Sequence, residues 1–213
     1  VQGPNAKTVV EKCFNIDLND VKFFHFKNTK LNGVNCIVSR TGYTGENGFE
    51  IYGPWNEGGK LWDALVAAGA VPCGLGCRDT LRLEAALMLY GNDITAETTP
   101  LEAGIDMFVK LESGNFVGRD ALLKQKQEGL KRKLVGFTLE EKGIPRHDYL
   151  VVDGKDNTVG VVTSGTLSPS LGIPVGLAYI NTDKLNDGSK LFVKIRTKNI
   201  PLKQMKLPFL KKY

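Results

Sequence analysis

Two charged side chains in this 213-residue sequence stand where secondary-structure preference alone would not place them. Glu50 lies inside the alternating run Phe49–Tyr52, although carboxylates are poor strand formers. Arg78 lies at or next to the start of a helical stretch, where a cation opposes the helix dipole. A carboxylate held on a strand can accept two parallel hydrogen bonds from a planar, guanidine-like heterocycle, and an arginine can bind an anion or a carbonyl oxygen. The plainer alternatives are a water-facing glutamate and a surface arginine paired with an acid such as Asp79 or Glu84.

Two glycine-containing loops, Thr41–Gly48 and Thr163–Ser170, are rich in small polar residues. Such loops allow the backbone to approach a ligand closely, and they are equally typical of hairpin turns. Arg82 and Glu84 are more simply explained as charged surface residues, each paired with an opposite charge, than as site residues. None of these features identifies a site when it is taken alone.

Other catalytic signatures are missing from the sequence, including a phosphate-binding loop, a dinucleotide fingerprint and a Gly-x-Ser-x-Gly nucleophile turn. His25 and His147 are the only histidines, too few for an ordinary zinc enzyme site. Cys73 and Cys77 are better explained as small residues that pack near a helix start than as metal ligands. We therefore expect no metal.

The composition is that of an ordinary globular protein, with 42% apolar and 24% charged residues. No apolar run approaches the roughly 20 residues needed to cross a bilayer, so no membrane-spanning helix is expected. Four cysteines do not make a disulfide scaffold, and they favour a reducing compartment. Residues 111–213 carry 18 basic and 10 acidic side chains, a net charge of +8. This basic half indicates either an anionic partner or a lysine-rich solvated surface.

The spacing of apolar residues predicts a mixed first half. Helices are expected at 5–14, 56–68, 77–89 and 118–128, with Gly91 as the stop of the third. Residues 34–52 are expected to form a hairpin in which Phe49 and Ile51 share one face and Glu50 and Tyr52 share the other.

From about residue 130 the pattern becomes β-rich. Short strands are expected at 134–139, 149–152, 159–163, 175–180 and 191–196. Turn signals between them predict a small antiparallel sandwich or barrel. The composition shift at 129–133 predicts a boundary between an α+β region at 1–129 and a β domain at 130–213.

A series of sequence blocks covers essentially the whole chain. The blocks are Val1–Pro4, Ser39–Ile51, Gly74–Ala85, Leu89–Ile94, Thr99–Gly104, Gly143–Arg146, Val162–Gly165, Ser168–Ser170 and Leu207–Phe209. In this order they resemble the aminomethyltransferase (T-protein) family of the glycine cleavage system. The Gly-Tyr-Thr-Gly-Glu and Arg-Asp-x-Leu-Arg-Leu-Glu segments together are the most specific part of the resemblance.

The resemblance implies a folate enzyme. The family transfers the one-carbon unit from the aminomethyl-lipoyl arm of H-protein to tetrahydrofolate and releases ammonia. Lipoylated H-protein and tetrahydrofolate are therefore the expected partners, and neither nucleic acid nor a membrane is expected. The implied fold is α+β, with the remainder of the folate-binding, ferredoxin-like domains followed by a C-terminal antiparallel barrel or jelly roll. The family is cytoplasmic in bacteria and mitochondrial in eukaryotes.

The resemblance also assigns site residues. Glu50, Arg78 and Tyr213 match positions that contact folate in the family, and Tyr43 and Arg146 lie in matching blocks as pocket-shaping candidates. Pterin presents an amide N–H beside an exocyclic amine, a donor pair that suits the Glu50 carboxylate. We therefore expect Glu50 and Arg78 to share a cavity and together grip a reduced pterin.

The family's catalytic aspartate precedes the block at Val1, so no residue is assigned as catalytic acid or base. The chain as given is expected to be a truncated piece with little or no transferase activity. One alternative is a folate-binding relative that aids iron–sulfur cluster assembly, although its Lys-Gly-Cys-aromatic motif is missing. A second is the folate module of a flavin-linked demethylating dehydrogenase. A third is a nucleic-acid-binding β domain. The β runs argue against it, because they lack a clustered aromatic platform on which bases could stack.

Overall fold

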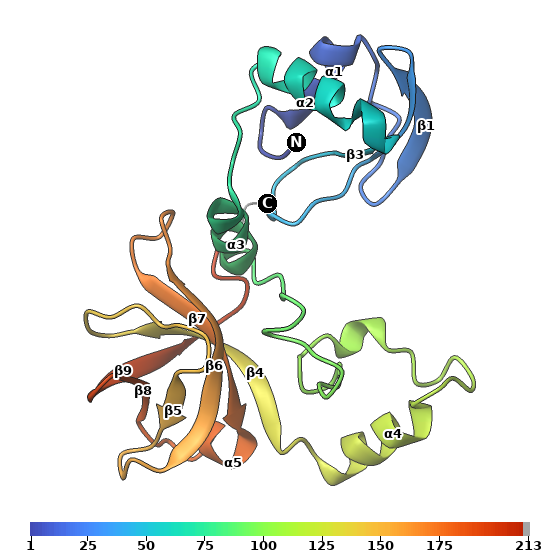
Figure 1. The fold of residues 1–213 in the computed structure, drawn as a ribbon. Coiled ribbons are helices and arrows are strands. Elements are labelled where there is room, and N and C mark those ends of the chain that lie inside the picture. Colours follow the sequence, from blue (N-terminus) through green and yellow to red (C-terminus); the bar gives the residue numbers. More distant parts are fainter. Residues whose placement is uncertain (211–213) are drawn as a thin grey trace. The chain divides into compact units, whose positions relative to one another are not determined.

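Residues 1–210 are the part of the chain that the computed structural model describes (Figure 1). They divide into two units, Val1–Arg82 and a second unit that begins at Leu83. Each unit has a hydrophobic core of its own. Within this part of the chain, no helix is long and apolar enough to cross a membrane. Tyr213, expected to contact folate, lies outside the described residues.

The first unit is a three-stranded antiparallel sheet in the order β1-β2-β3, covered on one face by two helices (Figure 1). Its elements are α1 (Ala6–Phe14), β1 (Phe26–Leu31), β2 (Val34–Ser39), β3 (Glu50–Tyr52), the 3₁₀ turn η1 (Trp55–Glu57), α2 (Gly58–Ala67) and the start of α3 (Leu75–Glu84). Val10 and Phe14 of α1 and Leu61 of α2 pack in one core with Cys36 and Val38 of β2. The hairpin expected at 34–52 is thus present as β2 and β3.

Strand β1 was not among the expected elements because its sequence, Phe-Lys-Asn-Thr-Lys-Leu, is polar at most positions. It pairs with β2 through the two-residue turn Asn32-Gly33, in which both residues have positive φ angles of 49° and 85°. Asn-Gly between two strands is a strong hairpin signal, so this strand was detectable from the turn rather than from its own pattern.

Helix α3 ends at Glu84, so the expected helix at 77–89 is too long by five residues. The chain leaves the helix at Ala86, which has a left-handed φ of 57° and whose N–H donates to Leu83 O at 2.9 Å. The Glu84 carboxylate is buried and accepts hydrogen bonds from Ser168 and Ser170. The helical spacing of apolar residues continues beyond Glu84, which is why the predicted helix was longer. The contact of Glu84 with the distant serines holds the backbone at this point.

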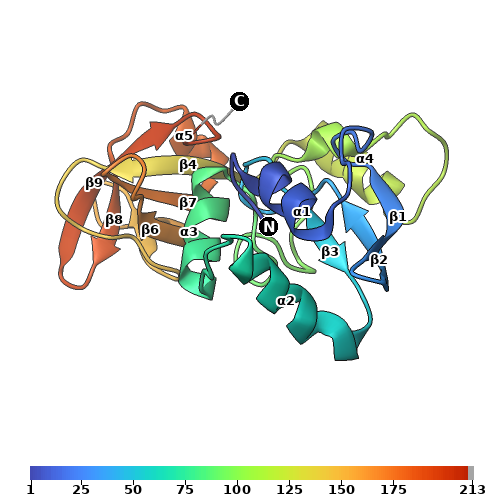
Figure 2. The same ribbon diagram turned by 90° about the horizontal axis from the view of Figure 1, so that it is seen from above.

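The second unit contains a closed antiparallel barrel in the order β4-β7-β6-β5-β8-β9, with β9 bonded back to β4 (Figure 2). Its elements are the 3₁₀ turn η2 (Asp106–Phe108), α4 (Arg119–Glu128), β4 (Arg132–Leu139), β5 (Leu150–Val152), β6 (Thr158–Leu167), β7 (Pro174–Asn181), α5 (Thr182–Leu185), β8 (Leu191–Ile195) and β9 (Lys198–Met205). Phe137, Val151, Val162, Ile180 and Val193 fill its interior. The expected α+β fold with a small C-terminal barrel is confirmed.

The barrel has one strand more than the five expected. β9 was not predicted because it carries Pro201 in its middle, and proline normally argues against a strand within a sheet. Leu207 and Phe209 follow β9 and pack over Gly136 of β4, where an added Cβ would lie 2.4 Å from Leu207 Cδ2. The Leu207–Phe209 segment therefore packs against β4 at Gly136, where β4 has no side chain.

Candidate functional site

Glu50 is the first residue of β3 and pairs with Ser39 of β2. Its side chain is half-buried, and its Oε2 accepts a hydrogen bond from the Thr41 hydroxyl and another from the Tyr52 hydroxyl at 3.3 Å. Tyr52 lies on the same face of β3 as Glu50, as the alternation predicts, while Phe49 is buried. The carboxylate is thus held on a strand by two hydroxyl groups.

Arg78 lies in the first turn of α3, and its Cζ sits 4.8 Å from the centroid of the Tyr43 ring. Tyr43 comes from the glycine-rich loop 41–48 and is half-buried, whereas Arg78 is exposed. The neighbouring acid, Asp79, pairs with Arg82 at 2.6 Å. Arg78 is therefore held by an aromatic face rather than by this carboxylate, and a guanidinium stacked in this way keeps its N–H edge available.

Arg78 lines a cavity of about 470 Å³ within the first unit. Gln2, Thr44, Ile51 and Cys77 also contribute to its wall. Ile51 faces this cavity, and Glu50 is not among the residues that line it. The reason is the alternation of β3, in which successive side chains point to opposite faces of the sheet. The structure thus places both expected folate contacts in one unit, but the expectation that they share a cavity is not confirmed, and their joint grip on a ligand stays a prediction.

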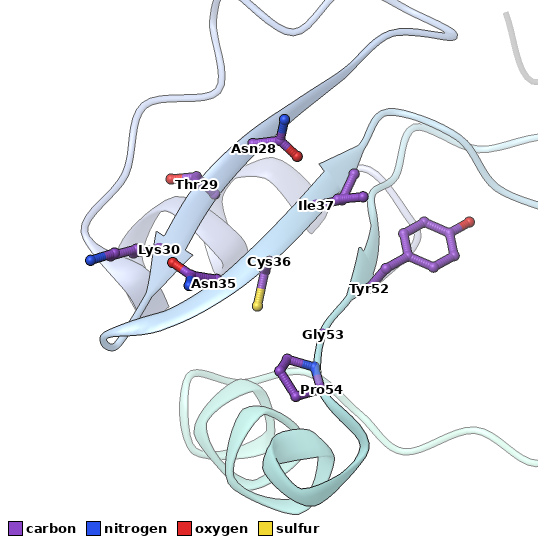
Figure 3. Close-up of a pocket in the computed structure, with 9 residues that line it drawn as sticks. All are labelled: Asn28, Thr29, Lys30, Asn35, Cys36, Ile37, Tyr52, Gly53 and Pro54. Carbon is purple, nitrogen blue, oxygen red and sulfur yellow. The ribbon is translucent and has the colours of Figure 1, made fainter.

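A second hollow, of about 650 Å³, lies beside the end of β3 (Figure 3). We call it the sheet groove; its lining residues are Asn28, Thr29, Lys30, Asn35, Cys36, Ile37, Tyr52, Gly53 and Pro54. Tyr52 connects the groove to the face of β3 that carries Glu50, because its hydroxyl bonds to that carboxylate. Burial raises the pKa of the Cys36 thiol, so the thiol stays protonated and unreactive at neutral pH. The groove itself therefore offers little reactive chemistry.

Arg146 belongs to the second unit, in the exposed segment before β5. The preceding residue, Pro145, packs on Gly165 of β6, where an added Cβ would lie 2.5 Å from the Pro145 carbonyl oxygen. His147 Nδ1 lies 2.8 Å from Thr163 O in the same region. The Gly143–Arg146 and Val162–Gly165 blocks are thus packed together on one side of the barrel.

The polar loop expected at Thr163–Ser170 is mostly part of β6, and its hydroxyl groups bind buried carboxylates. Thr163 and Ser164 donate to Asp93 at 2.5 and 3.0 Å. Ser168 and Ser170 donate to Glu84 at 2.5 and 2.8 Å.

These contacts explain the loop without a ligand. The expectation that Glu84 and Arg82 are surface residues is wrong, since Glu84 is 0% and Arg82 is 1% exposed, although Arg82 does pair with an acid, Asp79. A glutamate at the end of an amphipathic helix gives no local sign that serines far along the chain will bury it. Glu50 differs from Glu84 in this respect. The alternation of side chains along β3 already predicted that Tyr52, which bonds Glu50, lies on the same face of the strand.

Within residues 1–210, no three His, Cys, Asp or Glu side chains gather in a way that could hold a metal ion. Cys73 and Cys77 both line the cavity of Arg78. The chemistry that the first unit offers is therefore that of one supported carboxylate and one stacked guanidinium. The carboxylate suits a planar heterocycle with adjacent N–H donors, and the guanidinium suits a polar or anionic group.

Two sequence families account for nearly all of the chain. The family described as "GCVT N-terminal domain" matches residues 1–113, and the family described as "Glycine cleavage T-protein C-terminal barrel domain" matches residues 132–211. The chain belongs to the glycine cleavage T-protein family. The second match includes all six strands of the barrel, and the first includes Glu50, Tyr43 and Arg78.

Individual T-protein relatives agree with this membership. An aminomethyltransferase of Thermoanaerobacter pseudethanolicus is 50% identical over 96% of this chain and 56% of its own length. An aminomethyltransferase of Listeria monocytogenes serotype 4a is 50% identical over 100% of this chain and 59% of its own. The crystal structure of glycine cleavage system aminomethyltransferase T from Bartonella henselae superposes with a TM-score of 0.90 at 35% identity, covering 99% of this chain and 58% of that one. The chain thus spans a little more than half the length of the T-proteins it matches.

Proposed function

We propose that this chain serves the aminomethyltransferase reaction of glycine cleavage, in which tetrahydrofolate accepts the one-carbon unit carried on the lipoyl arm of H-protein. Membership of the T-protein family supports the proposal, as do the relatives named aminomethyltransferase. The compartment would be the cytoplasm, or the mitochondrion in a eukaryote. No catalytic acid or base is assigned among these residues.

The Glu50 carboxylate is the observation that carries the folate part of the proposal. Thr41 and Tyr52 both donate to its Oε2, and neither of these bonds uses Oε1. A carboxylate fixed in this way presents an acceptor edge, and a pterin presents an amide N–H next to an exocyclic amine. Because both bonds to the pterin would be charge-assisted, Glu50 would supply orientation as well as affinity.

Arg78 is proposed as the second folate contact. Its guanidinium is stacked at 4.8 Å from the Tyr43 ring centroid, which restricts a long side chain before a ligand arrives. Tyr43 would act through this stack and as part of the pocket wall. Tyr213 and Arg146 are proposed as further contacts on the strength of their matching blocks alone.

H-protein is proposed as the protein partner. The family's H-proteins tend to be acidic, and residues 111–213 carry a net charge of +8. Such a charge distribution would speed the encounter of the two proteins more than it would strengthen the final complex. The same basic half would attract the carboxylates of the folate tail.

Replacing Glu50 tests the folate assignment. We expect Glu50→Ala to weaken tetrahydrofolate binding by about 1–3 kcal/mol, the scale of a lost charged hydrogen bond. Isothermal titration of the whole chain with tetrahydrofolate under anaerobic conditions measures this loss. Glu141→Ala removes an exposed glutamate from the second unit and is the matched control, expected to bind as the unchanged chain does. Equal affinities for all three proteins would reject the role of Glu50.

Capture of lipoylated H-protein separates the transferase assignment from the alternatives. A T-protein should retain H-protein, whereas an iron–sulfur assembly relative or the folate module of a demethylating dehydrogenase should bind folate without it. A chain that binds neither folate nor H-protein but retains single-stranded nucleic acid would contradict the proposal altogether.

A further inference from the structure

The side chain of Gln2 lies inside the glycine-rich loop 41–48. A Cβ atom added to Gly42 would lie 2.1 Å from Gln2 Oε1, and one added to Gly48 would lie 2.3 Å from Gln2 Cδ. Atoms that are not bonded do not approach so closely in a packed protein, so both positions require glycine while the amide stays in place. The loop is therefore shaped around a side chain of the chain itself, which explains Gly42 and Gly48 without a ligand.

Both ends of the Gln2 amide are bonded to this loop. Nε2 donates to the Thr41 carbonyl oxygen at 3.1 Å, and Oε1 accepts from the Thr44 hydroxyl at 3.1 Å. The Gln2 backbone also forms an antiparallel bridge with Gly48. An amide that donates on one side and accepts on the other fixes the orientation of the segment as well as its position.

The two threonines that Gln2 bonds stand on either side of Tyr43. Tyr43 carries the ring against which Arg78 stacks, and the Thr41 hydroxyl donates to Glu50. We propose that Gln2 is a positioning residue that holds this loop so that Tyr43 meets Arg78 and Thr41 meets Glu50. The inference rests on the proposed function, in which Glu50 and Arg78 contact folate.

The loop needs such a support because of its composition. Glycine occupies positions 42, 45 and 48, and each glycine loses more backbone freedom on ordering than any other residue. Arg78 is exposed, and the Tyr43 ring is the contact that the described residues make with its guanidinium. A loop that moved would release both the ring and the guanidinium. Gln2 lies outside the loop, in the segment before α1, and its hydrogen bonds to Thr41 and Thr44 limit the conformations of the loop.

The stack itself can be observed by NMR in the whole chain. The side-chain N–H signal of Arg78 is shifted by the ring current of Tyr43, and Tyr43→Leu marks where that signal lies without the ring. We expect Gln2→Ala to move the Arg78 signal toward the Tyr43→Leu position. Gln127→Ala, an exposed glutamine on α4, should leave the signal where it is. An unmoved Arg78 signal in a folded Gln2→Ala protein would overturn the inference.

A double-mutant cycle tests the contact that underlies this argument. Alanine at Gly42 would collide with the Gln2 amide, so Gly42→Ala should displace the Arg78 signal in the otherwise unchanged chain. In the Gln2→Ala background the collision partner is gone, and adding Gly42→Ala should cause almost no further shift. Equal shifts in both backgrounds would contradict the placement of Gln2 and with it the proposed support.

Tetrahydrofolate titration connects the support to the site. We expect Gln2→Ala to raise the dissociation constant about 3- to 10-fold, the range that corresponds to one neutral hydrogen bond, with no change for Gln127→Ala. If Glu50→Ala and Arg78→Ala weaken binding while Gln2→Ala does not, the positioning role is wrong and the proposed function stands. If none of the three weakens binding, the proposed function fails, and the NMR comparison still decides whether Gln2 holds the loop.

Discussion

At the residue scale, Glu102 shows how one carboxylate holds the segment before the barrel to the start of β4. Thr99 N–H donates to Glu102 Oε2 at 3.1 Å, and Glu102 N–H donates to the Thr99 hydroxyl at 3.2 Å, the reciprocal pattern of a capping box. Arg132 Nε donates to Oε1 at 3.0 Å. Burial acts to raise the pKa of this carboxyl, but the hydrogen bonds from Thr99 and Arg132 outweigh it and lower the pKa below 4.5. The charged form is therefore favoured by folding.

The pH dependence of stability follows from the direction of this shift. Because the folded pKa lies below the unfolded one, Glu102 contributes stability above about pH 4.5 that is lost as the pH falls through the folded value. Glu102→Gln should reduce the free energy of unfolding by about 1–2 kcal/mol at pH 7 and by less at pH 3.5. Urea denaturation of both proteins at the two pH values measures the difference. A loss that is as large at pH 3.5 as at pH 7 would show that the charge of Glu102 is not what stabilises the unit.

Sequence patterns predicted the residue-scale contacts unevenly. The period of two in β3 correctly placed Tyr52 beside Glu50 and opposite Ile51. The stack of Arg78 on Tyr43 was beyond prediction, because neither residue has a local pattern that indicates the other. The roles of Glu50 and Arg78 in folate binding come from family resemblance and stay predictions.

At the scale of elements, local sequence patterns located most helices and strands. They failed where contacts with distant residues determine where an element begins or ends. Helix α3 stops at Glu84 because serines of the β6–β7 region bind its carboxylate, a contact that no local spacing reveals. Strand β9 was hidden by Pro201, although the neighbouring Ile200 is buried in the barrel core. The barrel could still be predicted, because the remaining strands are rich in strand-forming residues and are separated by turn residues.

The end of α3 offers a test of this explanation. Ser168 is 0% exposed and its hydroxyl donates to Glu84 Oε1 at 2.5 Å. Ser168→Ala would leave a buried carboxylate with one donor fewer, so we expect the free energy of unfolding to fall by about 1.5–3 kcal/mol. Chemical denaturation measures the change. Ser189→Ala removes an exposed serine that bonds Asp187 and serves as the control, with an expected loss of at most about 0.5 kcal/mol. If the two variants are equally stable, Glu84 does not depend on this hydroxyl.

At the scale of the whole molecule, charge is divided unevenly along the chain. Residues 1–110 carry 10 basic and 13 acidic side chains, whereas residues 111–213 carry a net charge of +8. The net positive charge is therefore carried by residues 111–213, and attraction between this part of the chain and an acidic partner acts over a distance that salt shortens.

Association with H-protein should accordingly depend on ionic strength. Raising the salt concentration from about 0.05 M to about 0.5 M is expected to lower the association rate constant about tenfold and to change the dissociation rate constant much less. Surface-based binding kinetics with immobilised H-protein measure both constants. A tetrahydrofolate titration at the same salt concentrations shows whether the basic half acts on the folate as well. An association rate constant that is independent of salt would rule out electrostatic steering by the basic residues of the segment 111–213.

The closure of the barrel has a consequence for how copies of the chain meet one another. Within residues 1–210, each barrel strand is bonded on both sides, since β4 pairs with β7 and with β9. In the same part of the chain, strands β1 and β3 each pair with β2 alone and therefore leave amide and carbonyl groups unpaired by a strand along one side. Lys27 and Lys30 on β1 discourage a neighbouring chain from adding a strand there. Edge-to-edge aggregation would therefore begin in the first unit, and mutations that remove these lysines would promote it.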